Sequence, residues 1–243
     1  MFSRRSFAAL VAAVAGGAAL AVSPVTPAQA IVGGKLATSA PWAVRVYEDG
    51  QPICTGAVVA PRWIITAGHC VRFDNSDISF RVGRLDQRRG QVVKRIPGHT
   101  VFAPNADVAL VEIPPVKVTP IPLPAKTATP AKRGTLLTVQ GWGATCEPNE
   151  SSCQSNLLRQ ATVRVIAHTD KRCDLLAGTA DYCAEKRSGL PVGGDSGAPA
   201  LTYTKKGRAV LAGVFTASDR EAVVAVADIT KARAWVAKTI GAK

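Results

Sequence analysis

Short apolar and β-branched runs, broken by Gly, Pro, Asn or Asp, follow one another along most of this 243-residue chain. Runs of this length between turn residues are typical of β-strands. We predict strands at 42–47, 57–59, 63–65, 78–82, 108–111, 136–139, 161–166, 209–214 and 223–226. Many short strands with regular turns indicate β-barrels or a β-sandwich.

A proline-rich stretch, 114–130, separates the predicted strands into two series. Proline cannot donate to a central ladder, so this stretch is interpreted as a linker between two halves of similar size, 31–125 and 126–243. The apolar residues of 229–240 recur at helical spacing. We therefore expect a short C-terminal helix packed on the second half.

Residues 1–30 have the pattern of a secretory signal peptide. Arg4 and Arg5 precede an apolar run, 7–22, and residues 28–30 (AQA) form a small-residue cleavage signature. The apolar run is short for a membrane span and is followed by prolines. Export is therefore expected, with no stable membrane anchor after the signal is removed.

Cleavage after residue 30 would leave Ile31 at the start of the secreted chain, 31–243. Residues 3–7 (SRRSF) are similar to the twin-arginine export signal of bacteria, and the general secretory route is the alternative.

Basic residues outnumber acidic ones, 30 to 17, which gives a formal net charge of +13. Such a surface favours anionic partners, cell-wall polymers among them. The cations are scattered in small clusters at 88–89, 132–133, 171–172 and 205–206. Without a basic helix or interleaved aromatic residues, they predict a solvated basic face and no specific nucleic-acid site.

All six cysteines lie beyond the predicted signal peptide. An even number in an exported chain indicates disulfides, and the spacing alone leaves every pairing open. There is no Cys-x-x-Cys and no His-x-x-x-His, so a zinc site is not expected.

Three motifs carry residues used in nucleophilic catalysis: 66–70 (TAGHC), 107–110 (DVAL) and 193–199 (GGDSGAP). Alone, a histidine beside apolar residues is usually structural, and Gly-Asp-Ser-Gly is a competent turn. In the order His, Asp, Ser they resemble the trypsin/chymotrypsin family of serine proteases, in a secreted bacterial form. Residues 31–34 (IVGG) and 141–143 (GWG) also match segments of that family.

The resemblance implies an all-β fold of two six-stranded Greek-key β-barrels with a short C-terminal helix. It also implies a serine endopeptidase that hydrolyses peptide bonds of protein or peptide substrates through an acyl-enzyme, without a cofactor. We expect the secreted enzyme to be a monomer.

The same resemblance assigns the catalytic triad. Ser196 is the nucleophile, and His69 takes its proton and returns it to the leaving amine. Asp107 holds the imidazole tautomer and stabilises the imidazolium. The backbone N–H groups of Gly194 and Ser196 form the oxyanion hole.

An activating ion pair is implied as well. In the family, the carboxylate beside the nucleophile binds the ammonium group of the mature N-terminus, and here these are Asp195 and Ile31. Signal removal alone would then create the activating terminus.

The family bridges the positions of Cys54 and Cys70, and those of Cys173 and Cys183. Cys146 and Cys153 remain as the third pair.

The specificity pocket departs from the trypsin pattern. Leu190 stands where trypsin-like members carry an acid, and Thr216, Ser218 and Val224 are the other expected pocket residues. An apolar floor disfavours Lys or Arg before the scissile bond and favours medium apolar residues. The segment 84–92, where relatives bind calcium, carries more positive than negative charge, so no metal is expected.

A second function stays open. The altered pocket and the basic charge also fit a catalytically weak protein of this fold that binds anionic polymers or protein partners. The complete triad favours the enzyme.

Overall fold

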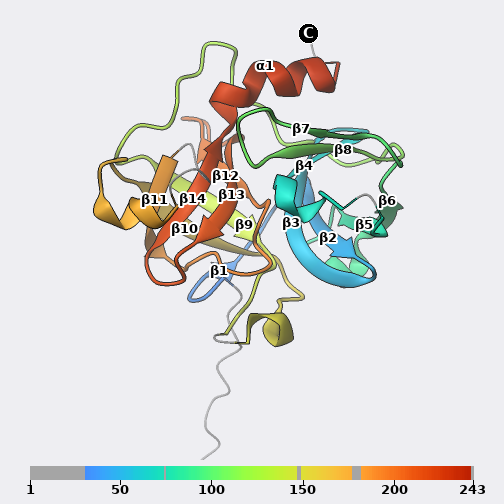
Figure 1. Ribbon diagram of the computed structural model, residues 1–243, viewed down its shortest axis with the longest axis horizontal. Coiled ribbons are helices and arrows are strands. Elements are labelled where there is room, and N and C mark those ends of the chain that lie inside the picture. The colour runs from blue at the N-terminus through green and yellow to red at the C-terminus, as the bar shows by residue number, and fades with distance from the viewer. Residues whose placement is uncertain (1–30, 74, 147–148, 177–181, 242–243) are drawn as a thin grey trace, which may run out of the picture.

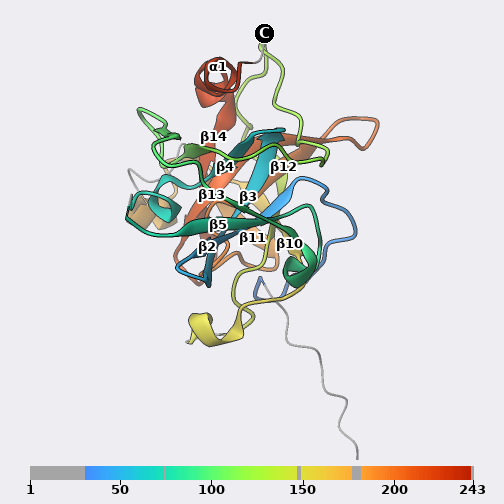
Figure 2. The ribbon, with the colours of Figure 1, turned by 90° about the vertical axis from the view of Figure 1, so that its right-hand side faces the viewer.

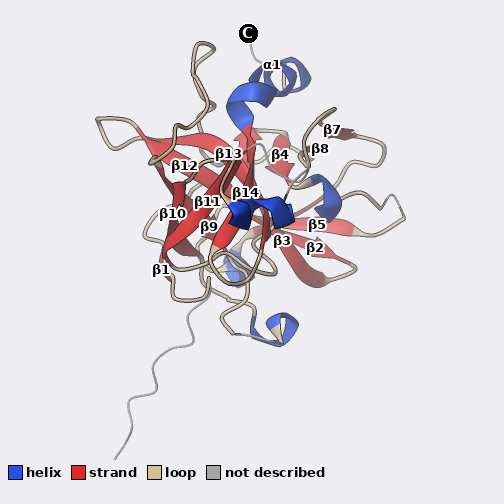
Figure 3. Ribbon diagram, turned by 60° about the vertical axis from the view of Figure 1, so that its left-hand side comes forward, coloured by secondary structure: helices blue, strands red, loops and turns tan. Residues whose placement is uncertain are grey.

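The computed structural model describes residues 31–73, 75–146, 149–176 and 182–241 (Figure 1). The predicted signal peptide, 1–30, lies outside the described residues. Figure 3 shows the strands gathered in two sheets, with helices as short outer segments.

The first sheet is antiparallel and has the strand order β6-β5-β2-β3-β4-β8-β7. Its strands are β2 (Ala43–Glu48), β3 (Gln51–Ala60), β4 (Trp63–Thr66), β5 (Ile78–Val82), β6 (Gln91–Lys94), β7 (Thr100–Phe102) and β8 (Ala109–Glu112). The sheet curls into a half-barrel, and no ladder joins β6 to β7 among the described residues.

The second sheet has the order β1-β10-β11-β14-β13-β12-β9, and a β9–β10 pairing closes six of its strands into a barrel. Its strands are β1 (Lys35–Leu36), β9 (Leu136–Gly141), β10 (Arg159–Val165), β11 (Tyr182–Ser188), β12 (Pro199–Tyr203), β13 (Ala209–Ser218) and β14 (Val223–Asp228). The predicted fold class, an all-β fold of the trypsin type with a C-terminal helix, is confirmed: one sheet is a closed six-stranded barrel and the other a curled half-barrel.

The helical segments are short. They are α1 (Ile229–Thr239) and the 3-10 helices η1 (Gly68–Cys70), η2 (Gln87–Arg89), η3 (Glu150–Cys153) and η4 (Lys171–Leu176). Asp228 begins α1 because its carboxylate accepts the Thr230 N–H at 2.7 Å.

Alternation of side chains explains the strands. In β5, Ile78, Phe80 and Val82 are buried while the residues between them are half-exposed. In β10 the buried and half-exposed positions alternate along the whole strand. This period of two fixes which face of each sheet turns inward.

A cluster of buried apolar side chains fills the junction between the two sheets. Ile65 and Leu110 enter it from the first sheet, Val214 from the second, and Ile229 and Val236 from α1. The helix therefore packs on both halves, whereas the sequence predicted contact with the second half alone. Figure 2 shows α1 at one end of the molecule.

The predicted division at 125/126 falls in the connection between the sheets. The start of the predicted first half, 31–125, does not belong to the first sheet, because Lys35 and Leu36 pair with β10 of the second barrel. The described part of the chain thus starts at β1 on the second barrel, crosses to build the first sheet and then returns to the second barrel.

Candidate active site

His69 and Asp107 are brought together by two neighbouring strands. His69 lies in η1 just after β4, and Asp107 lies just before β8, which pairs antiparallel with β4. The His69 Nδ1 lies 2.6 Å from Asp107 Oδ2, and the His69 backbone N–H donates to Asp107 Oδ1 at 2.9 Å. The carboxylate therefore fixes both the ring and the backbone of the histidine.

The environment of Asp107 favours its ionised form. Burial acts to raise its pKa, but hydrogen bonds from the His69 ring, the His69 backbone and the Gly68 backbone outweigh burial and hold the pKa below its usual value. A Cβ at Gly68 would stand 2.9 Å from Asp107 Oδ1, so glycine allows this approach. An ionised carboxylate here stabilises a proton on His69.

Ser196 reaches this region from the second barrel, in the turn between β11 and β12. The Thr55 N–H of β3 donates to the Ser196 carbonyl at 2.8 Å, which ties the serine loop to the first sheet. The structure thus places all three triad residues at the junction of the two sheets. Among the described residues, no hydrogen bond joins Ser196 to His69.

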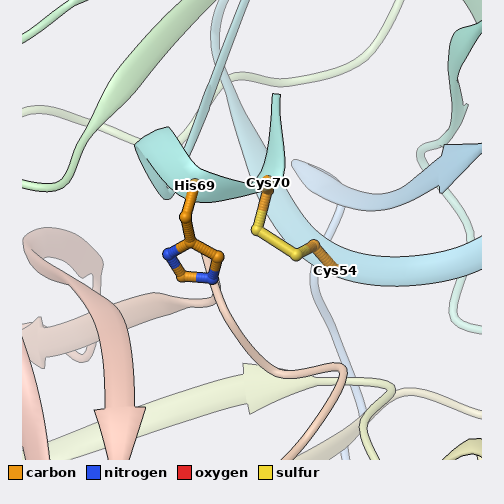
Figure 4. Close-up of side chains that lie close together, drawn as sticks. All are labelled: Cys54, His69 and Cys70. Carbon is orange, nitrogen blue, oxygen red and sulfur yellow. A yellow bond between two sulfur atoms is a disulfide. The ribbon is translucent and has the colours of Figure 1, made fainter. Parts of the chain in front are cut away.

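The Cys54–Cys70 disulfide lies beside the His69 ring, as Figure 4 shows. The two sulfurs and a ring nitrogen are within 4.8 Å of one another. A disulfide offers no thiolate, so this cluster is not a metal site. The bridge instead fastens η1, which carries His69, to β3.

Two carbonyl groups of the glycine-rich loop are held on its outer side. The Gly193 carbonyl accepts from the Ala144 N–H at 2.8 Å, and the Gly194 carbonyl accepts from Thr55 Oγ1 at 3.0 Å. The N–H groups of Gly194 and Ser196 have no acceptor within the described part of the chain. They are therefore free to bind an oxyanion, which is the role predicted for them.

Asp195 is fully buried behind this loop. Its Oδ1 accepts the Gly143 N–H at 2.7 Å and its Oδ2 accepts the Val192 N–H at 3.0 Å. A Cβ at Gly141 or Gly143 would overlap this carboxylate, which explains the Gly-Trp-Gly motif. Burial raises the pKa of Asp195 to about 7, although the two N–H groups and the charge of Arg45 oppose it.

Ile31 is also buried, with its side chain beside Gly34 and Gly189. The next residue, Val32, accepts the Leu190 N–H at 2.9 Å through its carbonyl. No hydrogen bond or ion pair joins Ile31 to Asp195 among the described residues. The structure therefore docks this segment on the second barrel in the unprocessed chain, where Ile31 is peptide-linked, and the ion pair expected after cleavage remains a prediction.

A cavity of about 160 Å³ opens beside Ser196. Its walls are formed by Val192, Gly193, Ser196, Phe215, Thr216, Ala217, Ser218 and Arg220. Of the four predicted pocket residues, Thr216 and Ser218 line it. Leu190 and Val224 do not, because both are packed in the core of the closed barrel, where Leu190 bridges Val32.

The rim of this cavity carries a positive side chain that the sequence analysis missed. Arg220 lines the cavity, and its Nε donates to Glu150 Oε1 at 2.9 Å. Asp219 is held in the turn, where its carboxylate accepts three backbone N–H groups. No carboxylate is among the described lining residues.

The structure contains three disulfides, which pair the cysteines as the family resemblance implies: Cys54–Cys70, Cys146–Cys153 and Cys173–Cys183. They fix η1, bound the loop around η3 and join η4 to β11. Disulfides of this kind fit an oxidising compartment. Within the described residues, no helix is both long and apolar enough to cross a membrane.

The segment where relatives bind calcium is engaged by other contacts. Asp86 forms an ion pair with Arg88 at 2.7 Å, and the Asp86 carboxylate also accepts the Arg88 backbone N–H. Its charge is thus balanced by a side chain from its own loop.

Sequence reasoning missed Arg45, Thr55 and Gln154, which surround the glycine-rich loop. The sequence does contain one sign of this arrangement, since Arg45 is a single charged residue inside the otherwise apolar strand 42–47. Charged residues are seldom buried without a specific partner.

The comparisons with known proteins agree with this geometry. The model of the Trypsin family matches residues 31–236, which is most of the chain. The chain belongs to the trypsin family. Serine protease 56 from Homo sapiens is 31% identical over 221 residues, covering 78% of this chain and 34% of that protein. Trypsin 5G1 from Aedes aegypti is 32% identical over 177 residues, covering 65% of each.

This trypsin-family chain therefore spans about a third of the length of the human serine protease 56. The Mus musculus protein of that name gives the same coverage at 32% identity.

Proposed function

We propose that this chain is a serine endopeptidase that acts through an acyl-enzyme. The observation that carries the proposal is the 2.6 Å contact between His69 and Asp107, at the junction where Thr55 fixes the Ser196 loop. Ser196 Oγ attacks the peptide carbonyl while His69 takes its proton. His69 then gives that proton to the leaving amine, and a water molecule releases the acyl group by the same steps.

The site would prefer an apolar residue before the scissile bond. This preference is supported by Val192, Phe215 and Ala217 in the cavity wall. Arg220 at the rim disfavours a cationic side chain, since it would bring two positive charges together. Thr216 and Ser218 would add hydroxyl groups that limit the size of the bound side chain.

The enzyme would be exported from a bacterium and activated when the signal peptide is removed. Cleavage after residue 30 would free the Ile31 amino group, and its ammonium would bind Asp195. This step is supported by the burial of Ile31 and by the raised pKa of Asp195, which marks a buried carboxylate in need of a cation.

The test is an intact mass before and after diisopropyl fluorophosphate treatment. The chain is secreted from a bacterial host, and Ser196→Ala is the matched control. We expect the starting mass of residues 31–243 with three disulfides, followed by one adduct on the natural chain and none on the control. Absence of an adduct on the correctly processed chain would contradict the proposal.

A second candidate function rests on a different surface. An open cleft of about 440 Å³ is lined by Arg84, Arg89 and Lys117, which form no ion pairs within the described residues. We propose that this basic cleft binds anionic polymers. Retention on a polyphosphate column at 0.15 M salt, lost in the triple alanine variant, would support it. Unchanged retention of that variant would contradict it.

A further inference from the structure

Arg45 is a fully buried cation in the middle of β2. Its Nη1 donates to the Gly194 carbonyl at 2.7 Å, and its Nη2 donates to Gln154 Oε1 at 2.6 Å and to the Pro52 carbonyl at 3.3 Å. A buried guanidinium is costly unless it is well bonded, so these partners account for its place in the first sheet.

Gln154 connects this arginine to the preceding residue of the loop. Its Nε2 donates to the Gly193 carbonyl at 3.1 Å and to the Glu150 carbonyl at 2.8 Å. Gln154 directly follows Cys153, which the disulfide joins to Cys146. Arg45 and Gln154, here called the Arg45–Gln154 clamp, thus hold two successive carbonyl groups of the loop.

Holding the Gly193 carbonyl also sets the direction of the Gly194 N–H in the same peptide. In a trans peptide the C=O and N–H point in opposite directions, so fixing the Gly193 carbonyl outward turns the Gly194 N–H the other way. Gly194 has φ +92°, and a Cβ there would overlap Gln154 Oε1. The clamp therefore fits closely around a residue that must be glycine.

The clamp also brings a positive charge to Asp195. The ionisable groups that act on this pair come from three elements: Tyr47 on β2, Glu150 on η3 and Asp195 on the loop itself. Glu150 is paired with Arg220. Burial lowers the pKa of Arg45 to about 10, while the charge of Asp195 opposes that change, so the guanidinium stays charged at neutral pH.

We propose that Arg45 is a positioning residue of the oxyanion hole. It holds the Gly194 carbonyl and keeps a positive charge facing Asp195 at alkaline pH, where an α-ammonium on Ile31 has lost its proton. This inference rests on the proposed peptidase function. It adds a second, internal cation that supports the loop together with the processed N-terminus.

The experiment measures kcat and KM for a p-nitrophenyl ester between pH 6 and 10.5, on processed chains. In Arg45→Met the hole would depend on the Ile31 ammonium alone. We expect kcat to be about tenfold lower at pH 7, with KM little changed. We also expect kcat to be lost at a lower alkaline pH than in the natural enzyme, by at least about one pH unit, because an amino group loses its proton more readily than a guanidinium.

Two further variants separate charge from hydrogen bonding. Arg45→Lys keeps a cation whose pKa falls on burial, so its alkaline midpoint is expected between those of Arg45→Met and the natural enzyme. Gln154→Leu removes the three hydrogen bonds of the amide and no charge, so it should lower kcat without moving the midpoint. Arg81→Met is the control, because Arg81 pairs across the strands with Arg45 but is half-exposed and does not touch the loop.

Failure of this inference is distinguishable from failure of the proposed function. If diisopropyl fluorophosphate does not label the natural chain, the peptidase proposal fails first. If the natural chain is labelled and Arg45→Met shares its kcat and alkaline midpoint, the role of Arg45 is overturned. Should Arg45→Met not fold, as judged by circular dichroism, an Arg45→Lys profile identical to the natural one overturns it as well.

Discussion

Asp107 and Asp195 lie on the two sides of the same site, and their surroundings shift their pKa values in opposite directions. Asp107 faces His69, and its pKa lies below the usual value despite partial burial. Asp195 is fully buried among backbone N–H groups, and its pKa is raised to about 7. The Asp107 carboxylate has a titratable partner, the His69 ring, at 2.6 Å. The hydrogen bonds that the Asp195 carboxylate accepts come from backbone N–H groups, which do not titrate.

This difference separates two roles of a carboxylate in one site. Asp107 is charged through its own contacts, which belong to the first sheet, so the general base forms locally. Asp195 relies on charges brought by distant segments, Arg45 on β2 and, in the proposed processed enzyme, the Ile31 ammonium. The oxyanion side is therefore the part of the site whose state depends on other regions of the chain.

The largest effect expected on the Asp107 side is loss of catalysis. Asp107→Asn leaves the shape of the side chain but favours the wrong tautomer of His69, so kcat should fall by about 10⁴-fold. Ester hydrolysis at pH 8 measures it. Asp86→Asn, which changes a half-buried carboxylate paired with Arg88 outside the site, is the control and should keep full activity. A loss below tenfold in Asp107→Asn would remove the contrast between the two carboxylates.

The oxyanion side is tested by Gly194→Ala. The added methyl overlaps Gln154 and moves the N–H donor, so we expect kcat to fall by about 100-fold or more. Gly98→Ala is a matched control, because Gly98 also has positive φ, +74°, with nothing within 4 Å of a Cβ. Equal kcat losses in the two variants would attribute the effect to backbone strain and not to the hole.

The pKa of Asp195 predicts a pH-dependent stability in the unprocessed chain, where Ile31 is peptide-linked. Because the folded pKa is raised, the native state binds the proton more tightly, and stability falls as pH rises from about 4 to about 7. Asp195→Asn should abolish this fall, which is on the order of a few kcal/mol. Urea unfolding of both chains at pH 4, 5.5 and 7 measures it, and parallel pH profiles would contradict the assignment.

Asp107 should show the opposite and smaller dependence. Its folded pKa is lowered, so its contribution is present above the unfolded pKa and lost as pH falls through the folded one. The side chain is 30% exposed, which limits the contribution to below about 1 kcal/mol. Urea unfolding of Asp107→Asn between pH 5 and pH 2 should therefore show a slightly flatter profile than the natural chain, and a steeper one would contradict this sign.

Most of the fold could be predicted from the sequence, because most strands either alternate apolar with polar residues or consist of a continuous apolar run. Among the elements missed, β11 (YCAEKRS) ends in charged residues and β12 begins with proline, so neither resembles a strand in isolation. Both are strands because their neighbours in the closed barrel supply the hydrogen-bond partners. Tertiary context overrides local propensity at such positions.

The pocket shows the same limit. The family resemblance predicts Leu190 and Val224 in the pocket, yet their side chains are buried in the barrel core. Arg220 lines the cavity because of the turn in which it lies. That turn has its conformation from the positive φ of Arg220 itself and from the hydrogen bonds that the Asp219 carboxylate accepts. Loop conformation sets these positions, and a strand pattern carries no information on it.

By itself, the sequence determined the all-β class and the family and named the candidate triad residues, because those depend on local patterns and on motifs in a fixed order. Only the tertiary structure decided which cations face Asp195, which side chains line the cavity and that Arg45 and Gln154 hold the oxyanion loop. Arg45 and Gly194 are 149 positions apart. A hydrogen bond across that separation depends on how the two sheets pack, and packing is a property of the folded chain as a whole.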